Sequence, residues 1–446
     1  MKVINDWFVS CSMKKDIKVL KDPITKKPIH PVTFADGIYL NNGTRLEDNL
    51  RYLFSRVSVI GDLEELLTNK KDNLVDALNE VFKDSDKPLY GVRFSGTKPE
   101  GIRLGNAENM NAYAYYGSGT YAPNDFDNIY PWSDIKRCLI SDDGIIWAYE
   151  GEPGFTLSPS IGNIFVEIPK FYQKIVYEND TLDLMISPYK REGYSLNPAF
   201  IDNKGKELPF IYIGAYEASC DGNRIHSKSD KIINGVTLNQ MKDMVKNKGK
   251  DFKLIDIYER SVIELLFCIE YATLDSQSIF KGKNIIKEST KVKTGESDVY
   301  LDYPSYTIMD SDKHSFRYRY MENLWGSAGE IIDGISIENF AVKLMEKELY
   351  SYSPDSKDSF IAERTLEGIP TLSDKQSSNK SYFCDYMSLP KDDKQKLYIV
   401  GHPHVLENEN QELSSLGNGL FSVSMNFNID DSSDYITSRL VYKQQK

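Results

Sequence analysis

The chain has 446 residues, of which 40% are hydrophobic and 12% aromatic, with 29 Tyr and 20 Phe. This length exceeds one ordinary hydrophobic core, so two or three domains are expected, and the tyrosine content favours β-rich binding surfaces. The formal net charge is −12, and no stripe of Lys and Arg runs along the sequence. We therefore expect no nucleic-acid partner, because phosphates are bound by clustered basic side chains.

Five cysteines are scattered along the chain and form no C-x-x-C pair. They are Cys11, Cys138, Cys220, Cys268 and Cys384. This spacing predicts neither a disulfide framework nor a zinc cluster. The first residues, MKVINDWFVS, lack an apolar signal-peptide core, and no run of 18 apolar residues follows. We expect no secretory signal and no membrane insertion, with folding in a reducing cytosol and release by lysis.

The first 86 residues divide into two predicted parts. Residues 1–44 are predicted to form a short β-rich arm, because three prolines and the turn signals ADG and NNG interrupt them. Residues 45–86 carry an apolar repeat of seven residues, broken at Gly61. Its members are Leu46, Leu53, Ile60, Leu67, Leu74 and Val81. Such a repeat is typical of a coiled coil or narrow bundle and predicts oligomerisation contacts, although two ordinary amphipathic helices would give a similar pattern.

From about residue 87 the sequence consists of short strand-like stretches, turns and aromatic-rich loops. Two helices are predicted within this region. One spans 237–249, because Thr237 is a typical N-cap and Gly249 a typical stop. The other spans 256–276 and carries an apolar stripe at helical spacing. Its stripe residues are Val262, Leu265, Leu266, Ile269 and Ala272.

Motifs of the common catalytic classes are missing from the sequence, which has no HExxH, GxSxG, Walker loop or strand-linked GxGxxG. His402 and His404 lie two residues apart, which on a strand places both rings on one face. That spacing suits a metal, but no third ligand is fixed nearby, so a surface pair is the preferred interpretation. Asp-rich runs lack calcium-loop spacing, and we predict no metal and no cofactor. A glycosidase that uses paired carboxylates stays an open alternative, because the distance between two carboxylates is not visible in a sequence.

Trp325 lies in the densest stretch, YRYMENLWGSAGEIIDGI at 318–335. Beside Glu330 and Asp333, its indole would suit stacking on a sugar. A Trp flanked by Leu and Gly is more often a buried core residue, so the core interpretation is favoured.

The stretch GLFSVSMNFNIDDSSD at 419–434 alternates apolar and polar residues. Its apolar residues are predicted to face the core, and they are Phe421, Val423, Met425, Phe427 and Ile429. The opposite face carries Ser422, Ser424, Asn426 and Asn428. These short neutral side chains both donate and accept hydrogen bonds, which suits hydroxyl-rich glycans or polar protein surfaces. A plain edge strand with a solvated polar face is the alternative.

Seven stretches in order resemble one known group of proteins. They are DFDNIYPWSDIKRC (125–138), DDGIIWAYEGEPGF (142–155), VEIPKFYQK (166–174), IYIGAYEAS (211–219), LLFCIEYATLDSQ (265–277), YRYMENLWG (318–326) and GLFSVSMNFN…SRL (419–440). Over residues 88–442 the chain resembles phage tail fibre and receptor-binding proteins with a C-terminal C-type lectin fold, like the phage major tropism determinant. The formylglycine-generating and sulfatase-modifying group shares that fold. Residues 30–50 resemble the part that precedes such domains in tail fibres.

The resemblance implies a homotrimeric fibre tip of a phage or phage-tail-like bacteriocin. The N-terminus would attach to tail or baseplate proteins, and the lectin-like domain would bind a bacterial surface receptor, either protein or glycan. Such a protein belongs to a virion or tail-like particle that is assembled in the bacterial cytoplasm and released by lysis. The fold class this implies is α+β: a C-type lectin-like region at 87–446 after a helical, coiled-coil-like trimerisation segment at 45–86 and the arm at 1–44.

Departures from the group limit what the resemblance implies. Its oxidase members use late cysteines, whereas Cys384 is the single late cysteine of this chain, so that activity is not expected. The sequence GHPHV at 401–405 replaces the usual Gly-Ser-Trp turn, and TSRL replaces GSRL, with Arg439 expected to keep a structural role. We therefore predict a binding protein and not an enzyme.

The resemblance also implies that late loops and strands form the receptor face. The candidate receptor-binding residues are His402, His404, Ser422, Ser424, Asn426, Asn428, Asp430, Asp431, Ser432 and Tyr435. The rival functions are a structural baseplate or collar component and, less favoured, an enzyme that degrades surface glycans.

Overall fold

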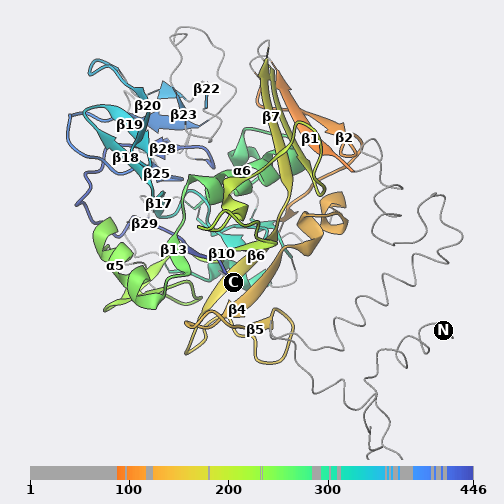
Figure 1. Cartoon of the computed structure of the whole chain (residues 1–446), viewed down its shortest axis with the longest axis horizontal. Helices are drawn as coiled ribbons and strands as arrows, with labels where there is room; N and C mark the ends of the chain where they lie inside the picture. Colours follow the sequence, from red (N-terminus) through yellow and green to blue (C-terminus); the bar gives the residue numbers. More distant parts are fainter. Residues whose placement is uncertain are drawn as a thin grey trace, which may run out of the picture. The chain divides into compact units, whose positions relative to one another are not determined.

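The computed structural model describes residues 88–444, with internal gaps. The gaps are 96–97, 117–123, 179–180, 232, 234, 284–292, 301–302, 309–312, 357–358, 361–362, 365–369, 372–384, 403–405, 408–412 and 415–418. Residues from Phe82 to Lys446 belong to one compact unit of the chain, which Figure 1 shows in colour where it is described.

Three larger sheets organise this unit, each made of strands that pair across long stretches of sequence. The five-stranded sheet has the order β2 (Ile102–Gly105), β1 (Tyr90–Ser95), β8 (Thr181–Ser187), β7 (Tyr172–Glu178) and β9 (Ser195–Leu196). The first six-stranded sheet has the order β13 (Phe252–Leu254), β30 (Leu440–Tyr442), β10 (Phe210–Gly214), β6 (Asn163–Pro169), β4 (Lys136–Ile140) and β5 (Ile146–Tyr149). The second, here called the late sheet, has the order β21 (Ser359–Phe360), β24 (Tyr386–Ser388), β28 (Val423–Ser424), β25 (Ile399–Val400), β17 (Gly329–Ile331) and β29 (Ile436–Thr437).

Smaller sheets and hairpins complete the described strands. A four-stranded sheet has the order β16 (Met321–Glu322), β15 (Arg317–Tyr318), β14 (Tyr306–Thr307) and β3 (Tyr115–Tyr116). A three-stranded sheet has the order β18 (Ile335–Glu338), β19 (Ala341–Leu344) and β20 (Lys347–Ser351). The two-stranded pairs are β11 (Ser219–Asp221) with β12 (Arg224–His226), β22 (Glu363–Arg364) with β23 (Pro370–Thr371), and β26 (Leu406–Glu407) with β27 (Leu413–Ser414).

Helix α5 (Leu238–Lys248) forms where the sequence predicted it. The Thr237 side chain accepts a hydrogen bond from the Gln240 N–H, and the Gln240 side chain accepts one from the Thr237 N–H. This capping box satisfies two backbone donors that a helix start leaves unpaired. Gly249 ends the helix with φ of 140°, in the half of φ space that favours glycine. Both predicted ends of this helix are therefore confirmed.

Helix α6 (Ile257–Tyr271) is enclosed on all sides. Asp256 caps it by accepting hydrogen bonds from two backbone N–H groups of the first turn. Its last residue, Tyr271, is five short of the predicted 276, and Ala272 follows in a left-handed conformation at φ 51°. The helix packs on β1 and β8, and in Figure 1 it lies between those strands and the late sheet. Burial extends beyond the apolar stripe, because Glu259, Arg260 and Glu270 on the other faces are also buried.

Trp325 is a core residue, as its sequence context favoured. Its side chain is 0% exposed, its indole N–H donates to the Phe280 carbonyl oxygen at 3.2 Å, and its ring packs edge-on against Phe267. A buried indole with its one donor satisfied cannot serve as a sugar platform.

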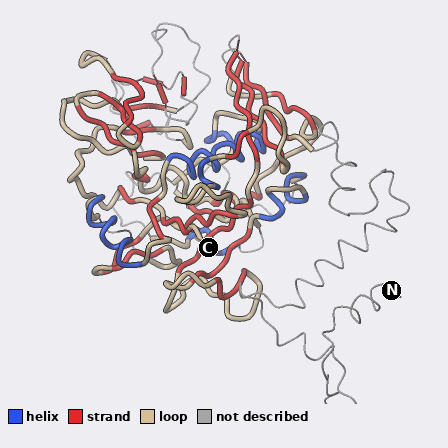
Figure 2. Tube along the Cα trace, in the orientation of Figure 1, coloured by secondary structure: helices blue, strands red, loops and turns tan. Residues whose placement is uncertain are grey.

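The predicted fold class, α+β with a C-type lectin-like domain behind a helical trimerisation segment, is wrong for the described part of the chain. Strands make up 35% of this part and helices 15%, with α5 and α6 as its two α-helices (Figure 2). Neither of these helices is a coiled-coil segment. The helical expectation rested on the seven-residue repeat at 45–86. The described strands are two to seven residues long, so they show little apolar alternation in the sequence, and they pair with strands that are distant in the sequence.

The first two predicted parts of the chain lie outside the described residues. These are the arm at 1–44 and the segment at 45–86, with the predicted oligomerisation residues Leu46, Leu53, Ile60, Leu67, Leu74 and Val81. The homotrimer stays a prediction.

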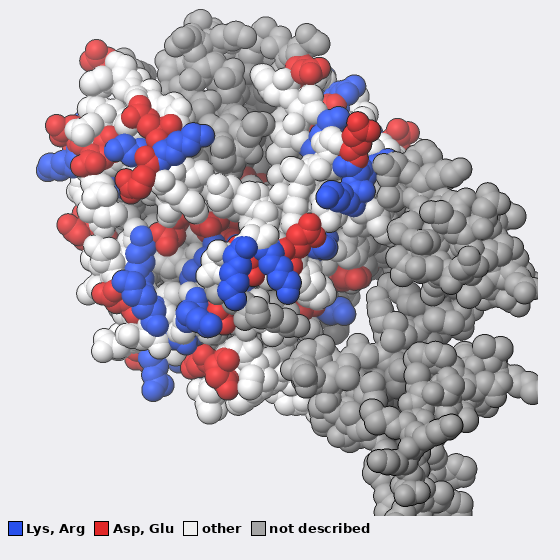
Figure 3. Space-filling view, viewed as in Figure 1, with Lys and Arg blue, Asp and Glu red and all other residues white. Residues whose placement is uncertain are grey.

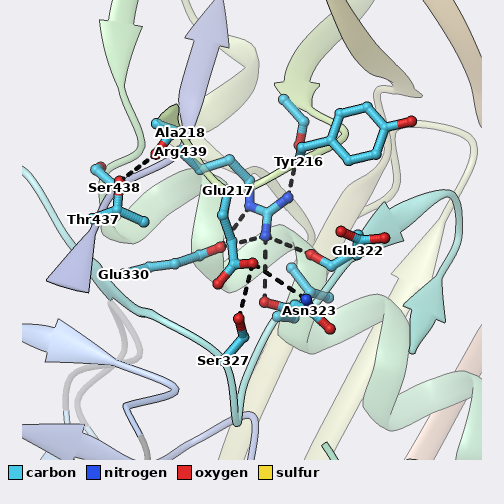
Figure 4. A network of polar contacts seen from close by, with 12 residues as sticks. Tyr216, Glu217, Ala218, Glu322, Asn323, Ser327, Glu330, Thr437, Ser438 and Arg439 are labelled. Atoms are coloured by element: carbon cyan, nitrogen blue, oxygen red, sulfur yellow. Dashed lines mark hydrogen bonds and ion pairs between the residues drawn. The ribbon is translucent and has the colours of Figure 1, made fainter. Parts of the chain in front are cut away.

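The last strands are fixed by one buried guanidinium. Between β29 and β30 the chain leaves the late sheet and enters the first six-stranded sheet, and Arg439 lies in this connection. Its Nε donates to Glu330 Oε1 at 2.6 Å, and its two terminal nitrogens donate to the carbonyl oxygens of Gly214 at 3.0 Å and Glu322 at 2.7 Å (Figure 4). Arg439 therefore ties β17 of the late sheet to β10 and to β16.

Glu330 in β17 is shared by a second buried arginine. Arg260 Nη1 on α6 lies 3.4 Å from Glu330 Oε2, and Arg260 also donates to the Leu324 carbonyl oxygen. Helix α6, the late sheet and the last connection therefore meet at one carboxylate.

We predict that Arg439→Met lowers the free energy of unfolding by about 3–5 kcal/mol, because it leaves part of a buried ionic network uncompensated. Arg439→Lys should lie between this variant and the wild type, since an ammonium keeps the charge but cannot reproduce the planar fork of donors. The measurement is the urea unfolding curve followed by tryptophan fluorescence.

Arg224→Met, at the exposed first residue of β12, is the matched control and should stay within about 0.5 kcal/mol of the wild type. An Arg439→Met midpoint equal to that of the control would contradict the role assigned to Arg439.

Candidate functional site

The predicted receptor face begins at β28, which is an inner strand and not an edge. Val423 and Ser424 pair with β24 on one side and with β25 on the other. Ser422 is 0% exposed and donates from Oγ to the Gly419 carbonyl oxygen at 2.9 Å, and Ser424 is 3% exposed. This corrects the prediction that these two serines lie on an open polar face, and it also removes the edge-strand alternative.

The apolar half of the alternation is confirmed for the first three residues. Phe421, Val423 and Met425 are buried, whereas Phe427 and Ile429 are half-buried and pack on a second apolar cluster. Both faces of 421–425 are covered because the late sheet has core on each side. A two-residue period cannot reveal this when the covering segments lie far away in the sequence.

Beyond β28 the chain turns outward through residues 426–435, here called the late loop. Asn428 and Asp431 hold its turn: the Asn428 N–H donates to Asp431 Oδ2 at 2.7 Å, and the Asp431 N–H donates to the Asn428 carbonyl oxygen at 3.0 Å. The buried Lys396 ammonium donates to Asn428 Oδ1 at 2.8 Å. The side chains of Asn428 and Asp431 are therefore used to shape the loop.

Asp430 and Ser432 form the exposed tip of the late loop. Within the described part of the chain, no hydrogen bond involves either side chain. Asn426 is half-buried, and its Oδ1 has no hydrogen-bond partner among the described residues. The backbone at both ends is fixed, because the Leu397 N–H donates to Phe427 O at 2.8 Å and the Gly329 N–H donates to Tyr435 O at 2.8 Å.

The remaining predicted residues lie apart from this tip. His402 is half-buried with its ring centroid 5.1 Å from that of Phe427. A Cβ on Gly329 would lie 2.7 Å from His402 Cβ, so the close approach of His402 to β17 needs glycine there. Tyr435 packs on Ile233 and Ala328. His404 lies outside the described residues.

Two buried carboxyl groups lie beneath the late strands. Burial raises the pKa of Glu217 to about 8, with Glu322 and Glu330 adding to the shift and Arg439 opposing it. Glu217 Oε2 lies 3.1 Å from Ser327 Oγ, which donates to it (Figure 4). Burial likewise raises the pKa of Asp385 to about 7, although the N–H groups of Gly419 and Phe421 both donate to it. Glu217 is therefore mostly protonated at neutral pH.

Charged side chains of both signs lie interspersed over the face of the molecule that Figure 3 shows. Within the described residues, no group of three or more His, Cys, Asp and Glu side chains is placed to hold a metal ion. Neither described α-helix has the length and apolar content that crossing a bilayer requires.

Sequence reasoning missed two clefts in the described part of the chain. One, of about 410 Å³, includes Asp127, Trp132 and Tyr303 in its lining, and the other, of about 520 Å³, includes Tyr149 and Glu150. Tyr320 lines both. The lining residues of the clefts are separated by up to almost 200 residues in the sequence. The one signal in the sequence was that the stretches YPWSDIKR and YRYMEN, which supply part of the lining, belong to the motifs of the family resemblance.

Comparison with protein-family models found no match for the chain, and a search of curated proteins found no relative.

We predict that Glu217→Gln flattens the pH dependence of stability. The stabilising contribution of the protonated carboxyl is complete below its ordinary pKa near 4.5 and is lost as pH rises toward 8. Over that window the wild type should lose up to about 1.4 kcal/mol per pH unit more than the variant. The measurement is the free energy of unfolding in urea at pH 5, 6, 7 and 8.

Glu192→Gln, at an exposed carboxylate, is the matched control. Equal slopes for the wild type and Glu217→Gln would show that Glu217 is ionised throughout this range, against the expected protonation.

Proposed function

We propose that the chain is the receptor-binding protein of a phage tail or phage-tail-like bacteriocin, and that the late loop contacts a bacterial surface receptor. The observation that carries this proposal is the exposed tip at Asp430 and Ser432, in a loop held at both ends by backbone hydrogen bonds, to Leu397 just before β25 and to Gly329 in β17. A loop that is polar at its tip and rigidly anchored loses little entropy on binding. The ordered resemblance over residues 88–442 supports the same assignment.

The charge of the late loop favours a particular kind of receptor. Asp430, Asp431 and Asp434 lie within five residues of one another, while the nearby Lys396 is buried and paired with Asp392. An acidic surface is a poor match for an anionic wall polymer. The proposed receptor is therefore a protein or a neutral glycan.

In this proposal the protein acts by binding and not by catalysis. The rival, an enzyme that degrades surface glycans, makes a different prediction for purified host cell-wall polysaccharide. Shortening of that polysaccharide on incubation with the chain, seen by size-exclusion chromatography, would contradict the proposal.

We predict that the double variant Asp430→Arg and Ser432→Arg lowers adsorption of the particle to host cells at least tenfold. Both side chains are exposed and make no hydrogen bond within the described part of the chain, so the substitutions add bulk and reverse charge without disturbing the core. The measurement is the adsorption rate of particles that carry the variant, with particle yield counted by electron microscopy.

Glu192→Arg, an exposed charge reversal outside the late loop, is the matched control and should adsorb normally. Unchanged adsorption of the double variant would exclude the late loop as the receptor contact. A fall in particle yield with normal adsorption per particle would instead favour the structural rival. Truncation before residue 439 is unsuitable here, because it removes Arg439.

A further inference from the structure

Two clefts share Tyr320 in their lining and together form a candidate binding site. The Trp132 cleft, lined in part by Asp127, Trp132, Ser133 and Tyr303, has a volume of about 410 Å³. The Tyr149 cleft, lined in part by Lys136, Tyr149, Glu150 and Thr156, has a volume of about 520 Å³. Each falls within the roughly 300–1,000 Å³ of small-molecule sites. Tyr320 lines both clefts.

Tyr320 is held there in a backbone conformation that bulky residues avoid. Tyr318 pairs with Met321, so Arg319 and Tyr320 are the two turn residues of a tight hairpin, with φ of 44° and 67°. Such turns favour Asn-Gly, because both positions are left-handed, and a bulky residue there costs on the order of 1–3 kcal/mol. The Tyr320 N–H donates to Pro304 O at 2.7 Å, and the Arg319 N–H donates to Ser305 Oγ at 3.1 Å. The surrounding structure thus keeps the ring in place.

The same turn type occurs in two other hairpins, at Asn339–Phe340 and at Met345–Glu346. Neither of these turns lines one of the two clefts. Strain alone therefore does not identify the site. What distinguishes Tyr320 is that this strained residue lines both clefts.

Each cleft presents one carboxylate whose charge is already compensated. Asp127 Oδ1 accepts from Arg319 Nη1 at 2.7 Å, and Glu150 Oε2 accepts from Arg137 Nε at 3.0 Å. Both arginine side chains are almost completely buried, whereas the carboxylates keep 27% and 23% of their side-chain surface exposed. The exposed oxygens retain lone pairs that can accept further hydrogen bonds.

We propose that the two clefts bind a neutral, hydroxyl-rich oligosaccharide, with sugar rings on either side of Tyr320. Hydroxyl groups donate to carboxylates, and aromatic rings pack against the apolar faces of sugars. The lining arginines Arg319 and Arg137 already donate to carboxylates from all their bonded nitrogens, which leaves them little to offer an anionic ligand. The charged lining disfavours an apolar ligand. Lys136, whose ammonium lies 5.8 Å from the Tyr149 ring centroid, adds a donor for ring or hydroxyl oxygens. This site is separate from the late loop and does not depend on its role.

Two substitutions block the clefts without touching a buried group. Ser133 and Thr156 are exposed, and the one hydrogen bond that involves either side chain in the described part of the chain runs from Ser133 Oγ to its neighbour Asp134. Ser133→Trp fills the Trp132 cleft, and Thr156→Trp fills the Tyr149 cleft. Ser160→Trp, at an exposed position that lines neither cleft, is the matched control.

The experiment measures binding of the purified full chain to an array of neutral bacterial-surface oligosaccharides. Polyphosphate is the anionic ligand for comparison. Affinity for the best neutral glycan is then measured by calorimetry. We expect each blocking variant to lower it at least tenfold and Ser160→Trp to leave it unchanged. Tyr320→Asn, which removes the ring but tolerates the left-handed turn, should also lower it at least tenfold while remaining folded.

The proposal is overturned if no neutral glycan binds, if polyphosphate alone binds, or if the blocking variants bind as the control does. These outcomes are distinguishable from failure of the proposed receptor function, because adsorption is tested with late-loop variants that leave both clefts intact.

Discussion

The rest of the described structure depends on the burial of Arg439 at the point where the chain passes from one sheet to another. A buried guanidinium is tolerated only when its donors are satisfied, and here they reach Glu330 and two backbone carbonyl oxygens. The flanking residues repeat this pattern, since Thr437 Oγ1 donates to Ala218 O at 2.6 Å and Ser438 Oγ donates to Ile331 O at 2.8 Å. Polar side chains next to the C-terminus thus fix the relation between the two six-stranded sheets.

Because of this constraint, the late region has a buried framework, residues 419–425 and the strands around them, and an exposed surface, the tip of the late loop. The segment 419–425 is pinned by Asp385 and by strands on both sides, so its serines belong to the framework. The late loop starts and ends on that framework, yet its tip residues Asp430 and Ser432 have no structural bonds within the described part of the chain. A sequence can therefore change at the tip at little cost in stability, which is what a surface that selects among receptors requires.

Local features of the sequence predicted local structure well. Thr237 and Gly249 marked both ends of α5, and the neighbours of Trp325 correctly favoured a core position. Each of these outcomes is decided by a few adjacent residues. Local pattern also found that Phe421, Val423 and Met425 are buried.

Non-local structure was not predictable in this way. Ser422 and Ser424 look like surface residues because they alternate with apolar ones, and only pairing with β24 and β25 shows that they are enclosed. The clefts beside Tyr320 likewise combine Asp127, Tyr149 and Tyr303, which no spacing rule connects. The burial of Arg260 and Glu270 in α6 was unforeseen for the same reason, since their partners Glu330 and Arg319 lie far away in the sequence.

The buried charges around Arg439 are also the reason why we expect the stability of the framework to depend on pH. Glu217, Glu322 and Glu330 lie close enough to influence one another, and Arg439 and Arg260 supply the nearby positive charges. Arg260 also pairs with the buried Glu264, so the carboxylates outnumber the guanidinium groups, and protonation of Glu217 reduces the excess negative charge. The acid form of this residue is thus part of the folded framework at neutral pH. The tip residues Asp430 and Ser432 make no side-chain hydrogen bond to this network within the described part of the chain, so charge reversal at the tip is expected to leave the buried charges around Arg439 as they are.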